Sequence, residues 1–271
     1  MAQQPSYINP EDVDTIVEEW LASEYGDVLD DETDFVQTRA TRIIAARLRD
    51  AVEDEFPFAL VTGPAGCSKT ITCRHFLRYV REQWPQLNTA WIHAQPNYEP
   101  SALLEALALN LYITRTRRFR DLLHTVHTQL SAKRMVAVVD EAQRMPRESF
   151  EVLKYLADET SSTFILICTE DFAPQIRRWR DIESRIGVVA EAEPVSPEEL
   201  IEMPKLAGLP KASRQKNNEH TGGVMRDVLR LLKQIDRTIA RNADKGLGRA
   251  NFTAKAVVAV AQKLNLAGGG Q

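Results

Sequence analysis

The chain of 271 residues lacks the features that mark membrane and secreted proteins. No apolar run approaches the ~20 residues that span a bilayer, and no basic-then-apolar stretch of the secretory type stands at the N-terminus. Cysteine is scarce: the chain has only Cys67, Cys73 and Cys168, an odd number without metal-ligand spacing, which argues against a disulfide framework. Cys73 and Cys168 are expected to be small buried residues. We therefore expect a cytoplasmic protein.

Basic residues are rare at one end of the chain, and acidic residues are rare at the other. Residues 1–56 contain 4 basic and 15 acidic side chains, whereas residues 204–271 contain 4 acidic and 13 basic ones. The two excesses nearly cancel, because the net charge is only −4. A basic end of this kind is suited to a polyanion. Two solvated faces, or head-to-tail packing between copies, explain the pattern equally well.

A phosphate-binding loop is the most specific signal in the sequence. It follows the apolar run 58–62 and departs from the pattern G-x-x-x-x-G-K-[ST] only at Ser68, which replaces the second glycine. The backbone N–H groups of such a loop bind phosphates, Lys69 reaches the outer phosphates and the Thr70 hydroxyl binds magnesium. The sequence therefore predicts a site for ATP and Mg²⁺ formed by Gly63, Pro64, Ala65, Gly66, Cys67, Ser68, Lys69 and Thr70.

Short apolar runs alternate with helical patterns around this loop, which is typical of a parallel sheet with crossover helices. We predict strands at 58–62, 89–94, 135–139, 163–168 and 187–190. Helices are predicted at 37–53, 69–83, 101–112, 119–131, 149–158 and 174–183. No strand pattern follows residue 196, and short helices are expected there. The predicted fold class is α/β, a five-stranded parallel P-loop domain with a small all-α lid at its C-terminal side.

Four segments follow from these patterns. We expect an acidic helical segment at 1–34, a nucleotide-binding α/β domain at 35–195, a helical lid at 196–266 and a flexible tail at 267–271. The first segment contains an amphipathic pattern, because apolar residues recur there at the spacing of one helix face: Val13, Ile16, Val17, Trp20 and Leu21.

Two adjacent carboxylates end the third predicted strand. Asp140 and Glu141 follow the apolar run 135–139, about 70 residues after the loop. On a strand of this type the first acid holds magnesium, and the second polarises the attacking water as a general base. A polar helix cap after a buried strand is the plainer explanation, but the loop upstream strongly favours catalysis.

Three further positions complete the predicted site. Thr169, after the fourth strand, is expected beside the magnesium-water site, and Arg226, after Gly222-Gly223, is expected to close over the nucleotide. Arg185 is predicted to project onto the γ-phosphate of a neighbouring subunit, where a guanidinium stabilises the charge of the transition state. Each has a plainer alternative, since Thr is common after strands and surface arginines are common. The same holds for Arg177, Arg178 and Arg180, which suit a solvated face equally well.

The order of these motifs resembles that of the AAA+ ATPases over roughly residues 35–240. Within AAA+ ATPases the chain is most similar to the DNA-target-selecting ATPases of transposons, the group of the Mu-phage B protein, TnsC and IstB. Three short segments carry this narrower resemblance: 34–38 (DFVQT), 140–143 (DEAQ) and 183–186 (ESRI). Ser68 departs from the family pattern, and the first 34 residues leave no room for a separate helix-turn-helix domain.

The resemblance implies an ATPase that forms rings or filaments on duplex DNA with little sequence preference and presents that DNA to a transposase. Arginines are dense between the second and third predicted strands, and four of them are our candidates for contacts with DNA phosphates: Arg115, Arg117, Arg118 and Arg120. His93, at the end of the second strand, is expected to add a polar contact. The lid's Arg230, Lys233, Arg237 and Arg241 recur at helical spacing and suit a neighbour's acidic segment.

Two alternatives remain open. One is a helicase-loader or initiator ATPase of the same fold. The other is a nucleotide-gated DNA scaffold that barely hydrolyses ATP, because Ser68 strains the turn or slows hydrolysis.

Overall fold

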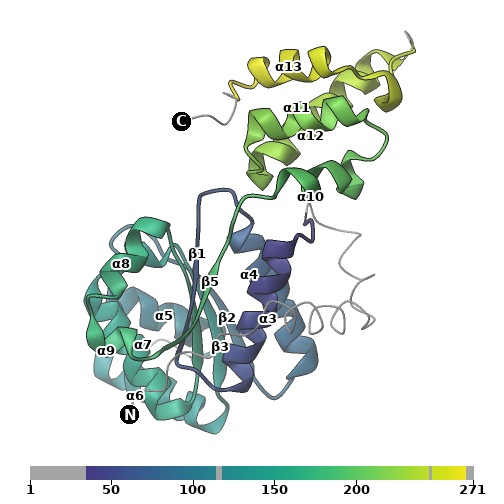
Figure 1. The fold of residues 1–271 in the computed structure, drawn as a ribbon. Helices are drawn as coiled ribbons and strands as arrows, with labels where there is room; N and C mark the ends of the chain where they lie inside the picture. Colours follow the sequence, from purple (N-terminus) through teal and green to yellow (C-terminus); the bar gives the residue numbers. More distant parts are fainter. Residues whose placement is uncertain (1–34, 114–117, 244–245, 267–271) are drawn as a thin grey trace. The chain divides into compact units, whose positions relative to one another are not determined.

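A computed structural model describes residues 35–113, 118–243 and 246–266 of the chain (Figure 1). The described residues divide into two compact units. The first unit comprises residues 35, 41–63 and 69–192, and the second comprises 36–40, 64–68 and 193–266, each less the undescribed positions. The first unit holds the sheet, and the second is helical apart from the short segments that it takes from the earlier chain.

A five-stranded parallel sheet forms the centre of the first unit, with the strand order β2-β3-β4-β1-β5. The three inner strands are buried along their whole length, as expected for a parallel sheet covered on both faces. Because the strands run parallel, their carboxyl ends meet at one edge of the sheet. The strands are β1 Phe58–Thr62, β2 Asn88–His93, β3 Met135–Asp140, β4 Thr163–Ile167 and β5 Ile186–Glu191.

Helices cover both faces of this sheet. Figure 1 shows α3 (Arg39–Glu53) and α4 (Lys69–Gln83) on one side and the later helices on the other. The later helices bury a continuous apolar core against the sheet. They are α5 Pro100–Asn110, α6 Phe119–Ala132, α7 Arg147–Thr160, α8 Ala173–Ile176 and α9 Arg180–Glu183, with the 3-10 turns η1 Ala142–Arg144 and η2 Glu170–Phe172.

The five-stranded parallel sheet predicted from the sequence is confirmed, and every strand bound agrees to within one residue. The single helix predicted over 174–183 is wrong, because the structure has two short helices, α8 and α9, separated at Trp179. Trp179 leaves the helical conformation (φ −92°, ψ 81°) and packs its ring against Phe150 and Phe172, with centroids 5.2 and 6.1 Å apart. Burial of this aromatic ring outweighs the local preference for a continuous helix.

The second unit has its own apolar core, formed mainly by α10–α13. Its longest helix, α12, is 17 residues long, so the expectation of short helices alone is wrong for this element. Ser196 caps α10 by accepting a hydrogen bond from the Glu199 N–H, as its position before a proline indicates. The elements are α10 Pro197–Glu202, η3 Pro204–Leu206, α11 Lys211–Thr221, α12 Met225–Arg241, η5 Arg249–Asn251 and α13 Ala254–Lys263.

All three cysteines are buried and unpaired with one another. Burial raises the pKa of Cys168 to about 12 and raises that of Cys73 further still, so both thiols stay protonated. None of the helices in the described ranges is long and apolar enough to cross a bilayer.

Candidate nucleotide-binding site

The loop 63–70 connects β1 directly to α4, so its backbone N–H groups stand at a helix N-terminus. Gly63 has φ +134°, and a Cβ placed there would lie 2.2 Å from the Ala192 carbonyl oxygen. Gly66 has φ +89°, and a Cβ there would lie 2.8 Å from Val224 Cγ1. Both positions therefore require glycine. The loop thus has the backbone shape of an anion site at a helix N-terminus.

Ser68 takes the backbone conformation of the glycine that the pattern would place there. Its φ is +61°, in the left-handed region, where a residue with a Cβ is strained by about 1–2 kcal/mol. The irregular residue thus preserves the path of the loop at an energetic cost. The backbone of the loop therefore keeps its conformation although a serine replaces the second glycine.

We expect Ser68→Gly to raise the free energy of unfolding by about 0.5–1 kcal/mol, since relief of strain exceeds the extra entropy of the unfolded chain. If the strain also slows catalysis, ATP turnover rises as well. Chemical denaturation and steady-state turnover measure the two effects. Ser161→Gly is the matched control, because Ser161 is also left-handed (φ +51°) but ends α7. A Ser68→Gly protein less stable than the wild type would contradict the strain argument.

Thr70 and Asp140 face each other at the carboxyl edge of the sheet. The Thr70 hydroxyl lies 3.3 Å from both carboxylate oxygens of Asp140, which is only 5% exposed. A hydroxyl beside a carboxylate offers the oxygen ligands that Mg²⁺ takes, together with water and phosphate. Among the described residues no cluster of three His, Cys, Asp or Glu side chains could hold a metal alone. The pair therefore fits a magnesium ion that phosphate oxygens help to bind.

Two more groups of the first unit adjoin this pair. His93 is in register with Asp140, and its Nδ1 lies 3.6 Å from Asp140 Oδ2. His93 thus lies beside the Asp140 carboxylate, and the DNA contact expected from the sequence stays a prediction. Lys69 donates a hydrogen bond from Nζ to the Gly63 carbonyl, which holds its ammonium group over the start of the loop.

Glu141 follows β3 in a strained conformation, with φ 60° and ψ 40°. Gln143 donates a hydrogen bond of 2.7 Å to Glu141 Oε2, and Arg144 Nη2 lies 3.3 Å from the same oxygen. Arg144 also donates to the Ala94 carbonyl at the end of β2. The carboxylate is thus oriented by two side chains whose roles the sequence did not reveal. Strain of this kind is concentrated at functional sites.

Thr169 lies two residues beyond the end of β4, the strand between β3 and β1. The carboxyl end of β4 therefore lies between the carboxyl ends of β1 and of β3, the strand that ends at Asp140. Thr169 is exposed, and its side chain does not cap the following turn. This position agrees with the role expected from the sequence, which stays a prediction.

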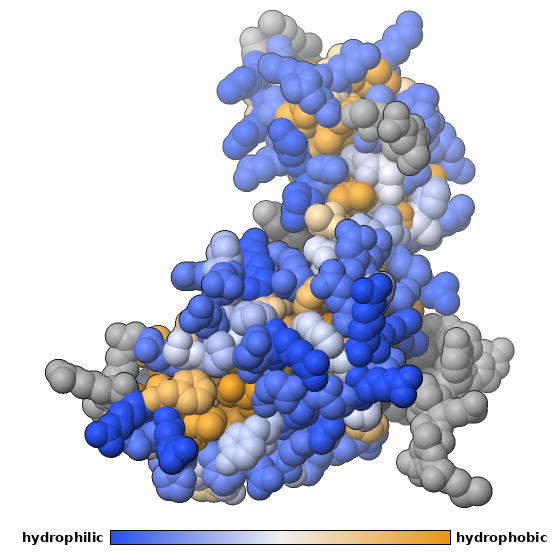
Figure 2. All heavy atoms as spheres, turned by 90° about the vertical axis from the view of Figure 1, so that its left-hand side faces the viewer, coloured by the Kyte–Doolittle hydropathy of each residue, from blue (hydrophilic) through white to orange (hydrophobic). Residues whose placement is uncertain are grey.

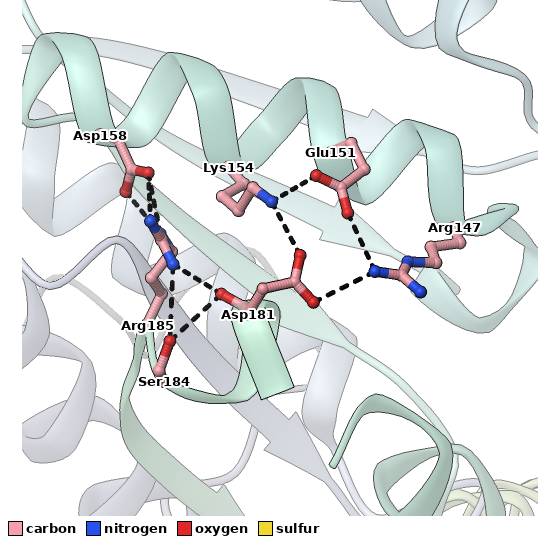
Figure 3. Close-up of polar contacts among 7 residues, drawn as sticks. All are labelled: Arg147, Glu151, Lys154, Asp158, Asp181, Ser184 and Arg185. Atoms are coloured by element: carbon pink, nitrogen blue, oxygen red, sulfur yellow. Dashed lines mark hydrogen bonds and ion pairs between the residues drawn. The ribbon is translucent and has the colours of Figure 1, made fainter. Parts of the chain in front are cut away.

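Arg185 is bound within its own chain (Figure 3). Its Nε and Nη2 donate to the Asp158 carboxylate at 2.6–2.9 Å, and its Nη1 donates to the Asp181 carbonyl at 2.7 Å. The hydrogen bonds to Asp158 raise the pKa of Arg185 further. The structure therefore does not bring Arg185 to Lys69 or Asp140 of the same chain.

The surroundings of Arg185 form a network between α7 and α9 (Figure 3). The Asp181 carboxylate binds Lys154 at 2.7 Å and Arg147 at 3.2 Å. The hydrogen bond from Lys154 lowers the pKa of Asp181 to about 2. In the described chain, by contrast, no carboxylate pairs with the other basic residues of this region, which are exposed: Arg177, Arg178 and Arg180.

Arg226 belongs to the second unit, near the first residue of α12. Its backbone N–H donates to the Gly66 carbonyl at 3.1 Å, within the same unit. The loop segment 64–68 is thus tied to the start of α12. The Arg226 side chain is exposed.

The candidate DNA residues are only partly described. Arg118 and Arg120 are exposed at the start of α6, whereas Arg115 and Arg117 lie outside the described residues. Large apolar side chains are exposed in the neighbouring stretch of sequence, and Figure 2 shows apolar areas on the mostly polar surface of the first unit. The exposed large apolar residues around this helix start are Leu109, Tyr112 and Phe119, which are 75%, 97% and 43% exposed.

Comparison with known proteins agrees with the fold. The sequence model of a family described as "AAA domain" matches residues 53–176. No curated protein matches the chain.

Solved structures share the fold at low sequence identity. Cdc6p from Pyrobaculum aerophilum superposes with a TM-score of 0.65 at 15% identity, over 78% of this chain and 65% of that one. The ORC2 protein of Aeropyrum pernix, solved as ADPNP–ADP complexes, gives 0.64 at 14%, over 86% and 70%. ORC1 of the same organism, in complex with DNA, gives 0.60 at 18%, over 88% and 68%. The chain thus spans about two thirds of the length of these proteins and has the AAA+ P-loop fold.

Proposed function

We propose that the protein is a magnesium-dependent ATPase that binds duplex DNA. The observation that carries the proposal is the arrangement in the first unit of Lys69, the Thr70–Asp140 pair at 3.3 Å and Glu141, which follow β1 and β3 at one edge of the sheet. The match to an AAA domain and the likeness to a protein solved with ADPNP support nucleotide binding.

Each residue has a distinct task in this proposal. The loop amides and Lys69 hold the phosphates, and Thr70 and Asp140 hold the magnesium ion. When bound, the ion neutralises charge that develops on the phosphate oxygens. Gln143 and Arg144 orient the Glu141 carboxylate, which accepts a proton from the attacking water.

Three residues are proposed to respond to the γ-phosphate. Thr169 would contact it or the attacking water, because β4 ends between the loop and Asp140. Arg226 would contact it as a lid residue, which the hydrogen bond between its backbone and Gly66 supports. Arg185 would act on the ATP of a neighbouring subunit, so the active form is an oligomer.

In the ATP-bound form the protein would assemble on DNA as a ring or filament and present it to a partner. The short segments 34–38, 140–143 and 183–186 favour a transposase as that partner. The likeness to Cdc6p and ORC proteins favours the alternative, an initiator-type ATPase, at least as well. The likeness to an ORC1 solved with DNA supports DNA as the shared ligand.

Electron microscopy and turnover assays test this proposal together. We expect ordered assemblies on mixed-sequence duplex DNA with a slowly hydrolysed ATP analogue and none with ADP, and turnover that DNA stimulates. The control is Lys69→Ala, which should lose both the assembly on DNA and the ATP turnover because it binds phosphate poorly. Monomers in every nucleotide state would refute the assembly. Assemblies without measurable turnover would instead favour the nucleotide-gated scaffold.

A further inference from the structure

Helix α12 carries a straight row of cations along one face. Arg226, Arg230, Lys233, Arg237 and Arg241 are all exposed and follow one another at intervals of four, three, four and four residues. At 3.6 residues per turn these positions fall within an arc of about 80° and extend over about 22 Å of the helix axis. We call the last four of them the α12 stripe.

The stripe has no partner in the described part of the chain. None of its four side chains makes an ion pair or hydrogen bond among the described residues, whereas Asp236 of the same helix is paired with Arg249 at 2.7 Å. The orientation of the stripe is fixed by the opposite face of α12, which buries five apolar side chains in the core of the second unit: Met225, Val228, Leu231, Leu232 and Ile235.

The stripe weakens the helix that bears it. Like charges four residues apart destabilise a helix by roughly 0.2–0.5 kcal/mol per pair, and Lys233–Arg237 and Arg237–Arg241 are such pairs. The helix dipole favours only Arg241 among the four, because it alone lies in the last turn of the helix. Packing does not require these charges, because the buried face is apolar. A bound polyanion would relieve the repulsion.

We propose that the α12 stripe binds the phosphate backbone of duplex DNA, an inference that rests on the DNA binding proposed above. The stripe offers charge without exposed apolar area, because the large apolar side chains exposed in the described chain all lie in the first unit: Leu109, Tyr112, Phe119 and Tyr155. Each DNA strand carries one phosphate per about 3.4 Å of its axis, so a row of this length faces several phosphates. Contacts of this kind are independent of sequence.

The acidic segment 1–34 of another copy is the rival occupant. It contains 11 acidic side chains and no Lys or Arg, so its charge also suits the stripe. The segment lies outside the described residues, but its sequence carries apolar residues at helical spacing, such as Trp20, and the stripe has no large exposed apolar side chain to receive them. Charge alone matches both occupants, but the absence of apolar area favours DNA.

The test compares two triple variants with equal loss of charge. The stripe variant is Lys233→Gln, Arg237→Gln, Arg241→Gln, and the control is Lys211→Gln, Lys255→Gln, Lys263→Gln, in α11 and α13 of the same unit. Fluorescence anisotropy with a mixed-sequence duplex and an ATP analogue gives the DNA affinity of the full chain at several salt concentrations. Thermal unfolding followed by circular dichroism verifies that both variants are folded.

We expect the stripe variant to bind DNA about 10- to 100-fold more weakly at 0.1 M salt and to reduce the steepness of the log–log salt dependence by about 2–3. The control should change the affinity much less. Equal affinities of the two variants would overturn the inference while leaving the DNA-binding function intact. Absence of DNA binding by the wild type would overturn the function itself. If the stripe variant, but not the control, loses self-association in the absence of DNA, as measured by ultracentrifugation, the acidic segment of another copy occupies the stripe and the inference is overturned.

Discussion

Glu141→Gln is expected to bind ATP as tightly as the wild type and to hydrolyse it about 10²–10⁴-fold more slowly. The amide has nearly the shape of the carboxylate but does not accept a proton from water. The effect should therefore appear in kcat and leave the nucleotide dissociation constant unchanged. Single-turnover hydrolysis and a fluorescent-nucleotide titration measure the two quantities separately.

A structural effect of this substitution is too small to produce such a loss. The ion pair between Glu141 and Arg144 is partly exposed, with both side chains 37% accessible, and pairs of this kind contribute about 0–1 kcal/mol. A destabilisation of that size leaves a domain of ordinary stability almost fully folded. Glu148→Gln is the matched control, because Glu148 is exposed on the first turn of α7. Wild-type turnover by Glu141→Gln would refute Glu141 as the general base.

The sequence predicts the sheet well because its three inner strands are apolar runs bounded by turns or by a motif. It also predicts the meeting of Thr70 and Asp140, since the order of motifs carries that information across 70 residues. The broken helix at Trp179 was not predictable in the same way. Its cause is a packing contact with Phe150, a residue from a different element.

The partners of the catalytic side chains were the least predictable part of the site. The approach of His93 to Asp140 depends on the pairing of β2 with β3, which periodicity does not specify. Asp158 binds Arg185 from 27 residues away, across two helices and a strand. Neither contact has a local sequence signature. Side chains that orient functional groups follow from the three-dimensional packing and appear only in the structure.

Arg185→Ala is expected to lower ATP turnover by about 10³-fold or more with little change in nucleotide affinity, if Arg185 stabilises the transition state at a neighbouring subunit. In the described conformation Asp158 binds this guanidinium through two nitrogens, so the arginine must leave Asp158 to act. Asp158→Asn weakens that pairing and retains the arginine. It should therefore keep turnover within a few-fold of the wild type or raise it.

The same pair of variants separates catalysis from architecture. Arg185 and Asp158 are about one-third exposed, so their ion pair contributes at most about 1 kcal/mol to stability. If the pair is only structural, both variants should lose the same small amount of stability and retain most of their turnover. A large loss confined to Arg185→Ala requires a role outside the pair, because a change of 1 kcal/mol unfolds too little protein to explain it.

Mixing experiments then determine whether Arg185 acts across subunits. Arg185→Ala retains the phosphate loop and Glu141, whereas Glu141→Gln retains the arginine and still binds ATP, so neither variant should hydrolyse ATP appreciably alone. In a mixed oligomer, an intact Glu141 of one subunit can meet an intact Arg185 of its neighbour, and turnover should return to a substantial fraction of the wild-type rate. An arginine acting within its own chain cannot give this result, since no subunit in the mixture has both residues. Mixtures as inactive as the separate variants would contradict an action across subunits.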